Sequence, residues 1–147
     1  MRLGTITIGE KEVRVAASGA TPYKYKVLFG RDLMDFMDRL NTVNERQKAI
    51  TEAEDMTEAE KEQEVLDLQE RYGINNSLAA DVTTELLYIM VCDAEKKVGT
   101  KNGFMQWLES FDTFDIRGEI GSVIEFYVGT AASDVKPKNP DAVPTEG

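Results

Sequence analysis

The chain has 147 residues, of which 41% are hydrophobic and 30% are charged, and its net charge at pH 7 is −10. This length predicts one domain with a sizeable core, and the negative charge argues against nucleic acid as a partner, because nucleic-acid binding needs a clustered basic surface. No apolar run is long enough to cross a bilayer, and no secretory signal follows Met1. We therefore expect a cytoplasmic protein whose partners include neither a membrane nor a nucleic acid.

The first segment, Leu3 to Ala17, alternates between apolar and polar residues. Ile6 and Ile8 alternate with threonines, and Gly9-Glu10-Lys11 supplies a turn. This pattern predicts a β-hairpin. Two strands alone are only marginally stable in water, so the hairpin must pack on helices or pair with another copy of the chain.

The next segment, 21–29, admits two interpretations. The alternation of Tyr23, Tyr25, Val27 and Phe29 would suit a strand. A threonine and a proline at positions 21 and 22 are typical of a helix start, with the threonine as N-cap. We predict a short helix that is interrupted at Gly30.

A second helix is predicted from Asp32, which we place in its first turn, to Asn41, with Leu33 and Phe36 on its apolar face. Residues 42–56 carry little periodicity, which predicts a loop or a frayed helical extension.

An acidic helix is predicted from Thr57 to Tyr72, because Thr57 and Glu60 have the spacing of a capping box and Gly73 follows. Between positions 52 and 70 one base, Lys61, accompanies nine acids, which are Glu52, Glu54, Asp55, Glu58, Glu60, Glu62, Glu64, Asp67 and Glu70. This charge favours a solvated helix face, and a partner-binding acidic face is the alternative.

Most large apolar side chains lie between 77 and 128, in three stripes with helical spacing. We predict a helix capped by Asn75 or Asn76 and closed at Gly99, a second capped by Asn102, and a last one ending at Gly129. The predicted core includes Leu86, Met90, Trp107, Phe111, Ile120 and Ile124.

The expected fold is therefore α+β and mostly helical, with an N-terminal β-hairpin (1–17) packed on a helical bundle (21–129). Residues 1–130 form one domain in this prediction. Residues 131–147 contain proline, small and charged residues, which predicts a disordered tail.

No catalytic signature is visible. The chain has no histidine, so a Cys–His site is excluded, and the single Cys92 lies in the most apolar helix, where a buried inert thiol is expected. Asp112 and Asp115 are interpreted as turn residues. We predict a protein that is not an enzyme and that holds no cofactor or metal.

An ordered set of features carries a family resemblance. The hairpin is followed by Thr-Pro-Tyr-Lys-Tyr (21–25) and Phe-Gly-Arg-Asp-Leu (29–33), then an acidic middle, then the apolar helix 86–93, Trp-Leu-Glu-Ser-Phe (107–111), a last apolar helix and a polar tail. Over about residues 21 to 131 this order resembles the tail assembly chaperones of long-tailed bacteriophages and prophages of Gram-positive bacteria.

The resemblance implies a chaperone that binds the tape measure protein, keeps it soluble, helps to recruit subunits of the major tail tube protein, and is absent from the mature virion. Tyr23, Tyr25, Phe29 and Phe104 are the predicted partner-binding residues, because they lie beside glycines or at ends of predicted elements. Self-association into a homo-oligomer is a further expectation. The alternative is a structural virion component of the connector or tail-terminator type.

Overall fold

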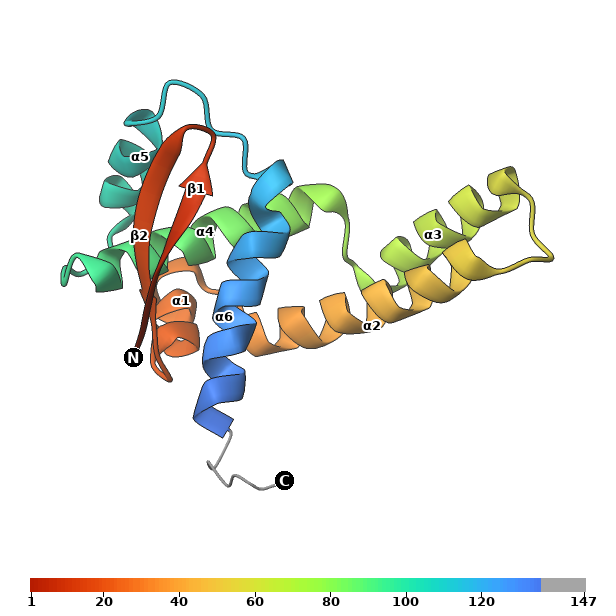
Figure 1. The fold of residues 1–147 in the computed structure, drawn as a ribbon, viewed down its shortest axis with the longest axis horizontal. Coiled ribbons are helices and arrows are strands. Elements are labelled where there is room, and N and C mark those ends of the chain that lie inside the picture. Colours follow the sequence, from red (N-terminus) through yellow and green to blue (C-terminus); the bar gives the residue numbers. More distant parts are fainter. Residues whose placement is uncertain (136–147) are drawn as a thin grey trace.

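The computed structural model describes the backbone of residues 1–135 and the side chains of residues 1–129. The chain folds around one central helix, α4 (Asn76–Ala94), which is contacted by β2, α1, α5 and α6 (Figure 1). Every side chain from Leu86 to Cys92 is buried, as expected for a helix that is apolar on all sides. Of the two predicted caps, Asn75 is the one used: its side chain accepts a hydrogen bond from the N–H of Leu78.

The predicted N-terminal hairpin is confirmed. Strands β1 (Arg2–Ile8) and β2 (Lys11–Ala17) pair antiparallel along their whole length. The turn is Gly9 and Glu10, because Lys11 already belongs to β2, and Gly9 has a φ of 64°. The hairpin buries its apolar face against α4 and α6, through Ile6, Ile8, Val13 and Val15.

The segment after the hairpin is a helix, α1 (Thr21–Phe29), as we predicted. Its cap differs from the prediction, because Ala20 is the N-cap residue and Thr21 is already helical. Thr21 is fully buried and its hydroxyl oxygen accepts a hydrogen bond from the N–H of Ser18 at 2.9 Å. The helix ends at Gly30, whose φ of 77° is easy for glycine only.

Helix α2 (Leu33–Glu52) is longer than predicted, since it continues past Asn41 for eleven more residues. Asp32 is its N-cap and accepts a hydrogen bond from a backbone N–H of the first turn. The extension was ambiguous in the sequence because its apolar residues are few. The extension is helical because Val43 is buried and Ile50 packs against the same core.

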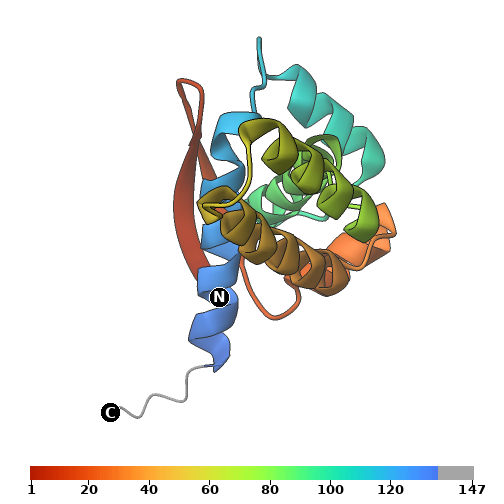
Figure 2. The ribbon, with the colours of Figure 1, turned by 90° about the vertical axis from the view of Figure 1, so that its right-hand side faces the viewer.

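Helix α3 (Glu58–Tyr72) packs antiparallel against α2, and the pair projects from the body of the molecule as an arm in Figure 1 and is seen end-on in Figure 2. The predicted capping box between Thr57 and Glu60 is present in both directions. Gly73 ends the helix with a φ of 64°. The acidic residues therefore lie mainly on α3 and at the tip of the arm.

Helix α5 (Lys101–Glu109) is capped by Thr100, two residues before the predicted Asn102. The Thr100 hydroxyl oxygen accepts a hydrogen bond from the N–H of Gly103 at 2.8 Å. Helix α4 also ends before the predicted Gly99, and the residues after Ala94 form a loop that leads to α5.

A short 3₁₀ helix (Arg117–Glu119) precedes the last helix, α6 (Ile120–Val135). This helix continues past the predicted end at Gly129. The predicted tail, 131–147, thus overlaps the final turns of α6 at 131–135, and the remaining positions lie outside the described residues.

The predicted core residues on α4 are confirmed, whereas α6 packs against the core through partly different residues than predicted. Leu86 and Met90 are fully buried, and Trp107, Phe111 and Ile120 are partly buried and pack against the core. Ile124 is only half-buried, because the inward face of α6 is formed instead by Val123 and Tyr127. Among the helices described, none is long and apolar enough to cross a membrane.

Candidate functional site

The four aromatic residues predicted to bind a partner have different environments. Tyr23 on α1 is 71% exposed, whereas Tyr25 is fully buried and has no surface to offer a partner. Phe29 and Phe104 are half-buried and contact each other edge to face, with ring centroids 5.1 Å apart. The structure therefore brings three of the four side chains into one cluster, since Tyr25 also contacts Phe29 at 5.5 Å, and it leaves Tyr23 on the surface.

The cluster continues along α5 as a row of aromatic contacts. Phe104 meets Tyr88 of α4 at 5.3 Å, and Tyr88 meets Trp107 at 5.6 Å. Trp107 then contacts Phe111 and Phe114 edge to face. Such ring pairs stabilise a fold beyond the area they bury, so these residues join α1, α4 and α5 and are engaged with each other.

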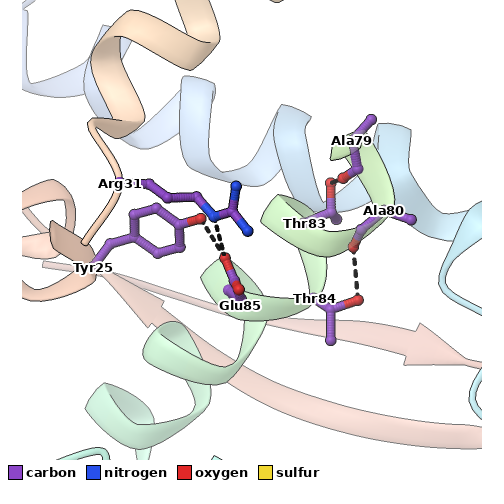
Figure 3. Close-up of polar contacts among 7 residues, drawn as sticks. All are labelled: Tyr25, Arg31, Ala79, Ala80, Thr83, Thr84 and Glu85. Carbon is purple, nitrogen blue, oxygen red and sulfur yellow. Dashed lines mark hydrogen bonds and ion pairs between the residues drawn. The ribbon is translucent and has the colours of Figure 1, made fainter. Parts of the chain in front are cut away.

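A buried polar cluster lies behind Tyr25 (Figure 3). The Tyr25 hydroxyl donates a hydrogen bond to Oε1 of Glu85 at 2.6 Å, and Nε of Arg31 donates to the same oxygen at 3.1 Å. The Glu85 side chain is 16% exposed. In the same view, Thr83 and Thr84 direct their hydroxyls to carbonyls of their own helix, so they do not join the cluster.

The electrostatics of this cluster favour a structural role. Burial, together with the hydrogen bond to Glu85, raises the pKa of the Tyr25 phenol well above its usual value. The phenol is therefore a neutral hydrogen-bond donor at physiological pH and does not act as an acid or base there. The cluster joins α1, the α1–α2 connection and α4 at one carboxylate.

An apolar site lies between α1 and the end of α4. We name it the α1–α4 groove; its volume is about 240 Å³, and its apolar lining comes from α1, the end of α4 and the loop that follows, through Val27, Leu28, Ile89, Cys92, Val98 and Gly99. Val27 is 71% exposed and Val98 is 89% exposed. Two large aliphatic side chains that stay in water at the mouth of an apolar groove indicate an interaction surface.

Charged side chains complete the lining of the groove. Lys24 of α1 pairs with Asp93 of α4 at 2.7 Å, and Lys97 pairs with Glu95 at 2.9 Å. The hydrogen bond to Glu95 raises the pKa of Lys97, so this lysine remains positively charged at physiological pH. The groove is thus an apolar floor with charged side chains at its rim.

The loop on the groove's edge has an unusual backbone. Helix α4 ends with the N–H of Lys97 bonded to the carbonyl of Cys92 at 3.0 Å, which is the long hydrogen bond of a Schellman motif. The residue that takes the left-handed conformation is Lys96, with a φ of 59°, where glycine is usual. This turn directs the chain so that Val98 lies at the mouth of the groove.

Cys92 lines the groove without being reactive there. Its side chain is buried, and burial raises the pKa of the thiol, which disfavours the nucleophilic thiolate. Within the described residues no group of three or more potential ligands could hold a metal ion. The groove can therefore bind apolar groups by burial, and it offers no activated nucleophile.

The sequence prediction missed Val27 and Val98. A signal for Val27 was present, because α1 is apolar on more than one face: Tyr25 and Leu28 point inward, while Tyr23 and Val27 occupy another side. A helix of that kind is either buried or engaged with a partner. Val98 carried no such signal, because its exposure depends on the turn at Lys96.

Comparisons with protein-family models, with curated proteins and with solved structures found no match for this chain.

Proposed function

We propose that this protein is a tail assembly chaperone of a long-tailed bacteriophage or prophage, which binds the tape measure protein, keeps it soluble and helps to recruit major tail tube subunits. It acts in the cytoplasm of the host and is absent from the mature virion. The observation that carries the proposal is the α1–α4 groove, where Val27 and Val98 remain exposed. The resemblance in the order of sequence features supports the same function.

The groove suits a helical client with apolar residues. Exposed apolar side chains of an unassembled chain would enter the groove, and their burial would provide the binding free energy. Tyr23 lies one helical turn before Val27 on α1 and is also exposed, so it extends the same surface. Of the four predicted residues, Tyr23 is the one best placed to contact a client.

The acidic arm has a separate part in this proposal. Helices α2 and α3 project from the body, and together with the loop between them (33–72) they carry twelve acids and five bases, a charge of −7 of the net −10. Charge of one sign keeps a complex apart from its neighbours in solution. Because the outer end of the arm projects away from α1 (Figure 1), a tail tube subunit could approach it while a client occupies the groove.

The test is co-expression with the tape measure protein of the same genome, followed by pull-down and measurement of its soluble fraction. We expect the unmodified chain to solubilise and retain the client, and the double variant Val27→Glu/Val98→Glu to lose both effects. The control is Leu66→Glu, which makes the same chemical change at a 59% exposed leucine of the arm. An equally insoluble client with and without this chain, and no recovered complex, would reject the proposal.

The alternative is a structural component of the virion. It predicts that the protein is present in purified particles, whereas a chaperone is absent from them. Mass spectrometry of purified particles separates the two.

A further inference from the structure

The surroundings of the α1–α4 groove have the opposite charge to the rest of the molecule. The groove is lined by two lysines (Lys24 and Lys97) and one carboxylate (Asp93). The chain from 95 to 101, which contributes three of the lining residues, adds Glu95, Lys96 and Lys101, so that these six charged residues sum to +2 in a protein whose net charge is −10. The Debye length at physiological ionic strength is about 8 Å, so a bound segment responds mainly to this local charge and much less to the distant arm.

The lysines near the groove are more available than the carboxylates to form an ion pair with a ligand. The Asp93 side chain is only 7% exposed and is held by Lys24, whose own side chain is 50% exposed. Lys97 pairs with Glu95, and both are about half exposed. Lys96 and Lys101 are exposed and form no ion pair with any described residue. Two exposed lysines within two positions of the groove lining in the sequence therefore have ammonium groups that no described carboxylate neutralises.

The backbone at Lys96 supports the same interpretation. A lysine in the left-handed conformation is less favourable than a glycine there, and the helix end would be satisfied equally well by glycine. Strained positions of this kind are enriched at functional sites. Here the strained residue is a cation two positions before Val98 in the same loop.

We propose that the α1–α4 groove binds a helical segment that presents one or two large apolar residues with acidic residues beside them. The volume of about 240 Å³ is below the usual range for small-molecule sites, roughly 300–1,000 Å³, and suits apolar anchors at helical spacing instead. Aspartate or glutamate beside the anchors would pair with Lys96 and Lys101. The inference deepens the proposed function, on which it rests, by naming the chemistry of the client segment.

Two designed peptides test the inference by fluorescence anisotropy with the full-length protein. Both carry leucines at i, i+3, i+4 and i+7; one has glutamates beside the leucines and the other has lysines. We expect the glutamate peptide to bind about tenfold more tightly at low salt, and the difference to shrink at high salt. Equal binding, or tighter binding of the lysine peptide, would overturn the charge selectivity.

Variants assign the binding to the groove. Lys96→Glu should weaken binding of the glutamate peptide roughly two- to fivefold, while Lys48→Glu, an exposed lysine on α2, should leave it unchanged. Val98→Glu should remove binding and Leu66→Glu should retain it. Retained binding in Val98→Glu, with native circular dichroism, would place the peptide elsewhere and reject the proposal.

A second copy of this chain is the competing occupant. Sedimentation of the protein alone as an oligomer that Val98→Glu converts to a monomer would show that another copy fills the groove, which contradicts the proposal. The peptide experiment tests the ligand chemistry of the groove, and the co-expression experiment tests the proposed function, so a negative result in one does not decide the other. Selective peptide binding without rescue of the tape measure protein would reject the proposed function and leave the ligand chemistry of the groove intact.

Discussion

Tyr25 of α1 and Glu85 of α4, sixty positions apart in the sequence, are joined by a hydrogen bond of 2.6 Å from the phenol to the carboxylate. Arg31, in the connection between α1 and α2, donates to the same carboxylate oxygen. One mostly buried side chain on the central helix thus contacts both α1 and the connection from which α2 begins. Because α1 also forms a wall of the α1–α4 groove, this contact determines the groove's shape.

Replacement of Tyr25 by phenylalanine tests this contact. Tyr25→Phe keeps the ring against Phe29 but removes one donor from Glu85, so we expect the free energy of unfolding to fall by about 1–2 kcal/mol. Tyr23→Phe, the same change at an exposed ring on the same helix, should alter it by less than about 0.5 kcal/mol. Urea unfolding measures the stability of both variants. A Tyr25→Phe variant as stable as the unmodified chain would show that the hydrogen bond contributes nothing.

Alkaline pH should destabilise the protein through its buried tyrosines. The folded-state pKa of Tyr25 lies above the ordinary value of 10.0, and burial also raises the pKa of Tyr88 and Tyr127. Below about pH 10 these phenols are protonated in both the folded and unfolded states, so their contribution to stability is constant; above it the unfolded state ionises first and stability falls.

The measurement is the urea midpoint between about pH 8 and about pH 11. We expect a constant midpoint in the lower part of this range and a decline above about pH 10, with a shallower decline in Tyr25→Phe. A midpoint that rises or stays constant across the whole range would contradict the raised pKa values.

Much of the fold could be predicted because its signals are local. The alternation in the hairpin, the capping box at Thr57 and the apolar stripe of α4 are each contained in a few residues, and each is confirmed. The length of α2 could not be predicted, because its outer half is helical through packing of Val43 and Ile50, and that contact depends on tertiary structure.

The candidate site was harder to predict than the fold. Aromatic residues at the ends of elements were expected to be exposed, but Tyr25 is buried against Glu85, and Phe29 and Phe104 pack on each other. The residues that remain exposed at the groove are aliphatic. The exposure of Val98 follows from where α4 ends, and that end is set by a left-handed lysine that no sequence rule anticipates.

Glycine at position 96 should stabilise the protein. Lys96 has a φ of 59°, so Lys96→Gly removes strain at the end of α4, and we expect a gain of about 0.5–1 kcal/mol in the free energy of unfolding. Lys97→Gly is the matched control; it removes the pairing with Glu95 and relieves no strain, so it should not stabilise. A less stable Lys96→Gly would mean that the lysine side chain contributes more than its backbone costs.

Two helical glycines should respond in opposite directions to alanine. A Cβ at Gly121 of α6 meets nothing within 4 Å, so Gly121→Ala should gain about 0.5–1 kcal/mol from helix propensity. A Cβ at Gly103 of α5 would lie 2.5 Å from the hydroxyl oxygen of Tyr88. That oxygen accepts a hydrogen bond from the N–H of Thr100, and the Tyr88 ring packs against aromatic neighbours, so the side chain cannot withdraw.

We therefore expect Gly103→Ala to lower the free energy of unfolding by about 1–3 kcal/mol through overpacking, although the same substitution stabilises most helices. Urea unfolding of the two single variants shows the sign of each effect. The cause is tested in a Tyr88→Phe background, where the clashing oxygen is absent and Gly103→Ala should cost distinctly less. An equal cost in both backgrounds would show that the Tyr88 hydroxyl is not what requires glycine at this position.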